Sequence, residues 1–376
     1  MNGEAAVVMG FFTFRVFLVG TIFLVFPRIS RKGLMFGAYL GEEQAKGPAR
    51  SQLLRSWDRG CNLIMVVALI VGWSIGLSGR WIPGNLIGTV VLLVPLFPLY
   101  VWTHQKARGL ASPDAARQAS RSSATLQVDE KQGDGFAALA LVLCTVASLA
   151  LVTYATLAFQ AMPDRIPTLG NLFGYGEEFT DKSLVSVLLV PSFNLVFAPF
   201  FALMALLITG AKRSLRGGSG GRSDQAQDTF RLAASNLFAA TALFTCLFLG
   251  VASWEMIKVW QGRADSVGPL FGLVAGIMVL YMGVALFRVM RLGQGGARLE
   301  SGSAEAPLTG GLADNDSWIL GMMYVNPADP AVMVEGRFGI GYTMNLGNRL
   351  AQVLLAVYLL ALLGLTILTL LAFGVL

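Results

Sequence analysis

Long apolar blocks alternate with polar segments along the whole chain. A helix of roughly 18 or more apolar residues can cross the ~30 Å hydrocarbon layer of a bilayer. Backbone polar groups need partners in lipid, so each block must be helical or part of a closed barrel, and these blocks lack the alternation of barrel strands. The pattern predicts an all-α polytopic membrane protein with about eight transmembrane helices, at about residues 5–26, 61–78, 84–103, 136–160, 184–209, 236–256, 269–290 and 350–375.

The polar segments divide the chain into five parts. The Ser-, Ala- and Gly-rich stretches 108–135 and 214–224 are predicted to be linkers. Two prolines and several glycines in 161–183 predict a loop of fixed, turning shape. We expect three helices in 1–107, a linker in 108–135, four helices with an exterior loop in 136–290, a cytoplasmic lobe in 291–349 and the last helix in 350–376.

Composition agrees with a membrane protein. Hydrophobic residues make up 55% of the chain and charged residues 13%, against about a quarter charged in soluble domains. The net charge of +6 is scattered over several loops without one continuous basic surface, so we expect the lipid bilayer as partner and no nucleic acid. No Lys or Arg precedes the first block, which predicts a retained helix, not a cleaved signal.

The distribution of basic residues predicts an orientation. The loops after the first, third, fifth and seventh helices carry 21 Lys and Arg, and the opposite loops carry 5. Basic loops stay in the cytoplasm. Both termini are therefore predicted to lie outside.

The lobe in 291–349 contains two short apolar runs that resemble strands. They are 318–325 and 338–344, and Asn-Pro and Asp-Pro pairs between them indicate turns. An unpaired strand would leave its backbone groups unsatisfied. We therefore predict that the two runs pair as one small antiparallel β-hairpin.

Enzymatic motifs are missing from the sequence. It contains no HExxH and no GxSxG with partners, so we assign no catalytic residue, metal or cofactor. His104 is interpreted as an interfacial anchor, and Gly339 and Gly341 as a bulge or close backbone approach, in preference to a nucleotide loop. The cysteines share no CxxC spacing and are interpreted as packing residues: Cys61, Cys144 and Cys246.

Two intramembrane residues are candidates for binding. Arg15 lies inside the first block, where an ion is costly, and both a snorkelling and a functional interpretation stay open. Blocks 84–103 and 184–209 each contain two prolines, which free carbonyls that can line a cavity. Asn194 would face such a cavity, or else bond a neighbouring helix at a simple kink.

Glycines at four-residue spacing occur in two blocks. Such spacing puts them on one helix face and lets another backbone approach closely. We assign them to bundle packing or dimerisation: Gly72 and Gly76, and Gly268, Gly272 and Gly276.

The exterior loop 161–183 is the other candidate binding site. It carries Asp164, Arg165 and Lys182 with three further acids, whereas the helices offer one Arg and no acid. Charges on a rigid loop suit recognition of a ligand by complementary charge. The alternative is that Asp164 and Arg165 only cap the loop against the helix ends.

Two segments resemble a known family. The run from Met162 to Thr168, with Tyr154-Ala155-Thr156-Leu157 before it, is similar to a Leu-Pro-Asp-Arg-Ile-Pro-Thr segment of uncharacterised bacterial membrane proteins, which are related to the immunity protein against the sporulation-delay toxin. Members usually have His where this chain has Leu169. A second segment of such proteins is similar to the lobe, in Trp318, Tyr324, Asn326, Arg337, Gly339, Gly341 and Asn345.

The resemblance implies a bacterial cytoplasmic-membrane protein concerned with resistance to, or sensing of, an envelope-active peptide. The leading hypothesis is therefore a non-enzymatic immunity, sensing or envelope-stress protein, with an envelope peptide or a membrane protein as partner. The alternative is a small-solute or lipid transporter that uses the third and fifth helices, and an intramembrane enzyme is the weakest hypothesis. The sequence does not predict an oligomeric state.

Overall fold

The computed structural model describes residues 3–31, 33–41, 44, 47–111, 135–167, 179–211, 221–299 and 314–372. In this part of the chain eight helices are long and apolar enough to cross a membrane, as predicted. They are α1 (Gly3–Ile29), α2 (Pro48–Leu77), α3 (Trp81–Arg108), α5 (Gly135–Phe159), α7 (Leu184–Thr209), α8 (Gly221–Trp260), α9 (Pro269–Leu292) and α10 (Arg349–Ala372).

The predicted linkers fall largely outside the described residues. Residues 112–134 and 212–220 are not described, and neither is 168–178 of the predicted exterior loop. Residues 221–224 belong to α8, so the prediction of a linker is wrong for these four residues.

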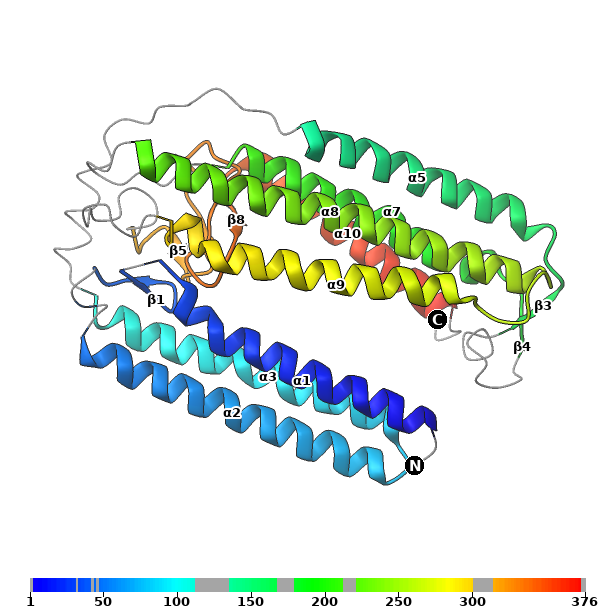
Figure 1. The fold of residues 1–376 in the computed structure, drawn as a ribbon, viewed down its shortest axis with the longest axis horizontal. Coiled ribbons are helices and arrows are strands. Elements are labelled where there is room, and N and C mark those ends of the chain that lie inside the picture. Colours follow the sequence, from blue (N-terminus) through cyan, green and yellow to red (C-terminus); the bar gives the residue numbers. More distant parts are fainter. Residues whose placement is uncertain are drawn as a thin grey trace.

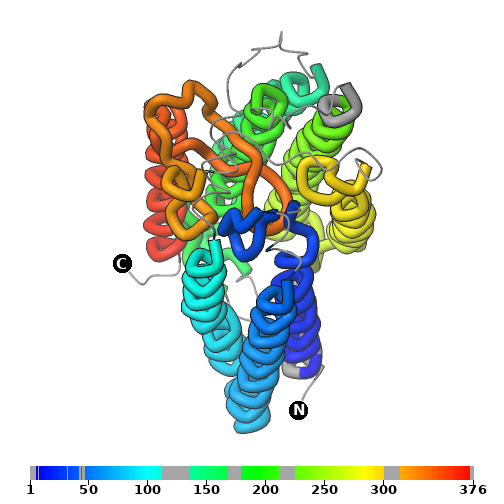
Figure 2. The backbone as a smooth tube through the Cα atoms, turned by 90° about the vertical axis from the view of Figure 1, so that its left-hand side faces the viewer, coloured from blue at the N-terminus to red at the C-terminus, as the bar shows by residue number. Residues whose placement is uncertain are grey.

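The helices form two groups that run side by side (Figure 1). Helices α1, α2 and α3 pack on one another, and α5, α7, α8, α9 and α10 form the second group. Figure 2 looks onto one end of the molecule and shows α1 to α3 as a separate bundle beside the rest. Among the described residues, the closely packed helix pairs lie within one group or the other.

Glycine allows α2 and α3 to approach closely in the first group. A Cβ on Gly84 of α3 would lie 2.6 Å from the Gly72 carbonyl oxygen and 2.8 Å from the Gly76 nitrogen of α2. The predicted packing role of Gly72 and Gly76 is therefore confirmed. On α9, a Cβ at Gly272 or Gly276 would meet no described atom within 4 Å.

Small residues build the core of the second group. Buried alanines of α5, α7 and α8 pack around Cys144, as is typical of helices that associate inside a membrane. The ring of Tyr358 in α10 stacks on that of Phe200 in α7, with 3.7 Å between the ring centres. The ring centre of Tyr281 in α9 lies 4.8 Å from that of Phe244 in α8. Most of the α9 and α10 surface stays exposed, which suits contact with lipid.

Short strand pairs and turns form a lobe at one end of the bundle, which we call the lobe end (Figure 1). Helix α1 begins and α10 finishes at the opposite, or far, end. The lobe consists of β1 (Leu34–Met35) with β2 (Ala38–Tyr39), β5 (Trp318–Ile319) with β6 (Met323–Tyr324), β7 (Met333–Glu335) with β8 (Tyr342–Met344), and the short helix η2 (Gln294–Gly296). At the far end, β3 (Arg165–Pro167) pairs with β4 (Phe179–Asp181).

The predicted pairing of 318–325 with 338–344 is wrong. Residues 318–324 reverse on themselves, because Leu320 and Gly321 have positive φ and turn the chain between β5 and β6. Strand β8 pairs with β7 instead. Among the described residues, one isolated parallel bridge joins the backbones of the two hairpins, between Tyr324 and Asn345, and Trp318 and Tyr324 pack with Val334 in one buried cluster.

Candidate functional site

The Asn-Pro-Ala-Asp-Pro run in the lobe forms two consecutive side-chain turns. Asn326 Oδ1 accepts the Ala328 N–H at 3.0 Å, and Asp329 Oδ1 accepts the Ala331 N–H at 3.1 Å. The Tyr324 hydroxyl donates to Asp329 Oδ2 at 3.0 Å. Burial raises the pKa of Tyr324 to about 12, so this donor keeps its proton. Short polar side chains bonded to nearby backbone groups fix such turns.

Asn345 joins these turns to β8. Its Oδ1 accepts the N–H groups of Asn326 and Gly347, each at 3.0 Å, and its Nδ2 donates to the carbonyls of Asn326 and Asp329 at 3.0 and 2.9 Å. Asn345 is fully buried. The amide uses both donor hydrogens and both acceptor positions, so this motif residue acts as a structural centre of the lobe.

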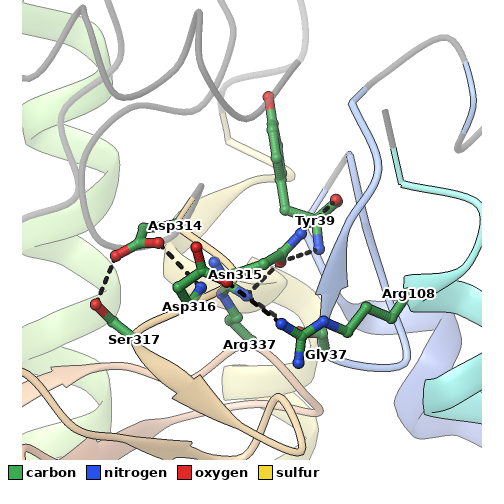
Figure 3. A network of polar contacts seen from close by, with 8 residues as sticks. All are labelled: Gly37, Tyr39, Arg108, Asp314, Asn315, Asp316, Ser317 and Arg337. Carbon is green, nitrogen blue, oxygen red and sulfur yellow. Dashed lines mark hydrogen bonds and ion pairs between the residues drawn. The ribbon is translucent and has the colours of Figure 1, made fainter. Parts of the chain in front are cut away.

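Arg337 connects the lobe to the β1–β2 hairpin that follows α1 (Figure 3). Its Nη1 donates to Asn315 Oδ1 at 2.8 Å and to the Gly37 carbonyl at 3.3 Å, and its guanidinium lies 4.9 Å from the Trp318 ring centre. Asn315 also exchanges two hydrogen bonds with the Tyr39 backbone, at 3.0 and 3.1 Å. Burial lowers the pKa of Arg337 to about 9, and the Asp314 carboxylate opposes that shift.

A second buried arginine makes a parallel connection. Arg31, just after α1, has its Nε 2.6 Å from Glu335 Oε1 of β7, and both side chains are almost fully buried. Its Nη2 donates to the Gly295 carbonyl of η2 at 2.8 Å. A Cβ on Gly295 would overlap the Arg31 guanidinium, and φ there is +57°. Glycine is therefore required at this approach.

Gln294 of η2 holds the loop between β7 and β8. Its Nε2 donates to the Gly336 and Gly341 carbonyls, both at 2.9 Å, and its Oε1 accepts the Gly341 N–H at 2.7 Å. Gly339 has φ of +80° and lies against Phe26 of α1. The close approach interpreted from the sequence is therefore seen at Gly339, whereas a Cβ at Gly341 would meet no described atom within 4 Å and the φ of +120° there favours glycine.

Aromatic and polar contacts bind α3 to the same lobe. Tyr100 donates to the Leu320 carbonyl at 2.8 Å, and its ring centre is 4.5 Å from that of Phe338. His104 Nδ1 donates to the Phe36 carbonyl at 2.8 Å and is buried. The anchor predicted at His104 is therefore directed at the lobe.

The structure separates the two intramembrane candidates. Arg15 of α1 bonds α3 in the first group, through Asn85 and Thr89. Asn194 of α7 is 1% exposed in the second group, where its Nδ2 donates to the Cys246 carbonyl of α8 at 3.1 Å. Its Oδ1 lies 3.4 Å from the Ser148 hydroxyl of α5. Asn194 therefore bonds neighbouring helices, and α7 continues as a helix through both of its prolines.

The far-end hairpin holds the three remaining candidates. Lys182 Nζ donates to the Met162 carbonyl at 2.8 Å and lies 3.5 Å from Asp164. Arg165 Nε lies 3.8 Å from Asp181 Oδ1, and both side chains are largely exposed. Trp260 of α8 donates to the Pro167 carbonyl at 3.1 Å, which anchors the hairpin to the bundle.

Sequence reasoning missed Arg31, Glu335, Gln294 and Asn315, because each contacts residues far away in the chain. It also missed an acid in the helices. Glu255 is buried in α8, where it accepts the Gly268 N–H at the start of α9 at 3.0 Å. The sequence did contain a signal for this residue, because Glu255 is an acid near the end of the apolar block 236–256. The described residues contain no group of three His, Cys, Asp or Glu that could hold a metal ion.

Comparison with known proteins gives one short match. The profile of DUF5808, a family of unknown function, matches residues 327–351. This stretch contains β7, β8 and Asn345, together with two of the residues that Asn345 bonds, Asp329 and Gly347. No curated protein and no solved structure matches the chain. The match therefore points to a recurring lobe segment and indicates no activity.

Proposed function

We propose that this multi-pass membrane protein is a non-enzymatic sensing, immunity or envelope-stress protein of the bacterial cytoplasmic membrane. The observation that carries the proposal is the buried junction in the lobe. Arg31, just after α1, bonds η2 and β7, and Gly37 of the following β1–β2 hairpin accepts a hydrogen bond from Arg337, just after β7. These partners belong to the segments around the second helix group. A ligand that shifts one group against the other at the far end would strain these contacts and change the lobe.

The proposal puts the lobe in the cytoplasm and both termini outside. The excess of basic residues in the loops at the lobe end supports this orientation. A reporter fused at residue 218 should be active in the cytoplasm, and one fused at the C-terminus should be active outside. The reverse pair of results contradicts the orientation.

The far-end hairpin is the proposed recognition element for an envelope-active peptide. The side chains of Asp164, Arg165 and Asp181 are exposed on a backbone that Trp260 and the buried Ile166 hold against α8. The resemblance of Met162 to Thr168 to the immunity-related family supports the same assignment. Charges on an anchored loop can recognise a ligand without large ordering costs.

Complementation tests this function. A strain that lacks the protein should become sensitive to an envelope-active peptide, and the wild-type chain should restore resistance. A double variant, Asp164→Ala with Arg165→Ala, should restore little resistance at normal protein levels. Arg263→Ala serves as the control, because it removes another exposed charge at the far end. Full protection by the double variant, together with loss of protection in Arg15→Leu, would overturn the recognition role.

That overturning result would favour a solute or lipid transporter. The separate packing of α1–α3 and α5–α10 favours this second candidate, because two groups joined at one end can separate at the other. Uptake of a labelled solute or lipid into vesicles that contain the purified protein would support it.

A further inference from the structure

Arg15 forms a polar cluster with α3 inside the apolar span of α1. Its Nη2 donates to Asn85 Oδ1 and to Thr89 Oγ1. Thr89 in turn donates to the Asn85 backbone carbonyl at 2.6 Å, which fixes the orientation of the Thr89 hydroxyl. Both partners are neutral, so the cluster keeps the full positive charge of the guanidinium.

The cluster lies close to the far-end surface of the membrane span. Asn85 and Thr89 follow Trp81, the first residue of α3, by about 6 and 12 Å along the helix axis. Arg15 starts at a depth between theirs, about 10 Å inside the span that begins at Val8. Helical side chains tilt toward the N-terminus, which for α1 is the far end, so the guanidinium is directed toward the headgroup layer.

The protein leaves part of this guanidinium unsatisfied. Nε of Arg15 is enclosed and has no hydrogen-bond partner, and the described residues offer acceptors to Nη2 alone. No described carboxylate pairs with it. The contrast is Arg31, which is buried against Glu335. A cation withdrawn from water is costly without a counter-charge, so an anion from outside the chain would supply the counter-charge that the described residues lack.

The surrounding surface identifies the source of that anion. Phe11 and Leu18 lie one turn before and one turn after Arg15 on the same helix face, and both are exposed, at 69% and 47%. An apolar track on both sides of a cation suits a lipid whose phosphate contacts the guanidinium while its acyl chain follows α1. Arginine binds phosphate well because its planar donors match the phosphate oxygens.

We propose that Arg15, positioned by Asn85 and Thr89, binds the phosphate of an anionic phospholipid in the far-end leaflet. A phosphatidylglycerol headgroup fits better than a zwitterionic one, because the latter brings its own cation to compete for the phosphate. The binding is independent of the sensing role, so either assignment can fail without the other.

Native mass spectrometry of the full-length protein in micelles tests the site. Wild-type protein should retain phosphatidylglycerol about tenfold more tightly than phosphatidylcholine, as expected for one charge-assisted contact. Arg15→Gln should remove that preference. Arg80→Gln, which removes an exposed charge at the same end, should keep it. An unchanged preference in Arg15→Gln overturns the proposal.

Two further measurements separate this site from its alternatives. Inorganic phosphate at millimolar concentration should leave the bound lipid in place, and displacement would assign the site to a soluble anion. Without lipid, Arg15→Gln should unfold at the same temperature as wild type or higher, because an unpaired cation is removed. A lower unfolding temperature together with an unchanged lipid preference would give Arg15 a purely structural role and reject the proposal.

Discussion

The two ends of the bundle use charge in opposite ways. At the lobe end, Arg31 and Glu335 are buried together, and Arg31 also donates to the Gly295 carbonyl of η2. At the far end, Arg165 and Asp181 form an exposed pair at 3.8 Å on a hairpin. A buried pair is costly to break because it leaves a charge without a partner, whereas an exposed pair is screened by water. The lobe end thus holds the two groups together through a buried pair, and the far end leaves its charged side chains exposed.

Breaking the buried pair should give the largest effect. Glu335→Ala leaves the Arg31 guanidinium buried without its carboxylate and should lower the free energy of unfolding by about 3–5 kcal/mol. Unfolding by SDS titration in mixed micelles measures the change. The matched control is Arg165→Ala at the far end. A change in Glu335→Ala as small as that in the control would show that the pair contributes little.

Removal of the Asn345 amide should have the next largest effect. Asn345→Ala deletes four hydrogen bonds and leaves the Asn326 and Gly347 N–H groups without their acceptor, so we expect a loss of about 2–3 kcal/mol. The same SDS titration applies. Asn348→Ala is a milder comparison, because Asn348 is bonded at the exposed start of α10. Equal losses in both variants would contradict a central role for Asn345.

The sequence predicted the helices well because their cause is local. Each apolar block needs only its own length and hydrophobicity to be assigned to a membrane span. Glycine spacing is a weaker guide, because among the described residues it marks close packing at Gly72 and Gly76 but not at Gly272 and Gly276. The lobe could be located but its pairing could not be predicted. Positive φ at Leu320 decides how β5 and β6 pair, and that conformation is uncommon for a residue other than glycine.

Long-range contacts explain the missed site residues. Arg31 is one of the basic residues in the loop after the first helix, and nothing near it in the sequence indicates that Glu335 lies against it. Glu255 was overlooked for a similar reason: its partner is the Gly268 N–H, which the α8–α9 turn brings back to α8. The pattern of residues within one helix predicts which of them are buried, but a contact between two distant segments can be seen only once the fold is known.

Removal of an interhelical hydrogen bond inside the membrane should lower the free energy of unfolding less than the two changes in the lobe. Asn194→Ala removes bonds from α7 to α5 and α8, and interhelical hydrogen bonds in membranes contribute about 0.6 kcal/mol on average. We expect a loss of about 0.6–1.7 kcal/mol in the SDS titration. Ser148→Ala should cost less, because only the 3.4 Å contacts are lost. A loss above that of Asn345→Ala would reverse the order of the two regions.

The exposed far-end pair should give the smallest effect on stability and the largest effect on recognition. Arg165→Ala removes a guanidinium that is 72% exposed and whose carboxylate partner is 92% exposed, so its unfolding in SDS should match wild type within error. Protection against an envelope-active peptide should nevertheless fall, because the charge is available to the ligand.

Asp181→Ala provides the matched test: it removes the other half of the pair and leaves Arg165 unpaired. If the ligand contacts Arg165 directly, Asp181→Ala should keep or increase protection while Arg165→Ala lowers it. Equal loss in both variants would mean that the pair acts by shaping the hairpin, and the contrast between a structural lobe end and a recognising far end would then be lost.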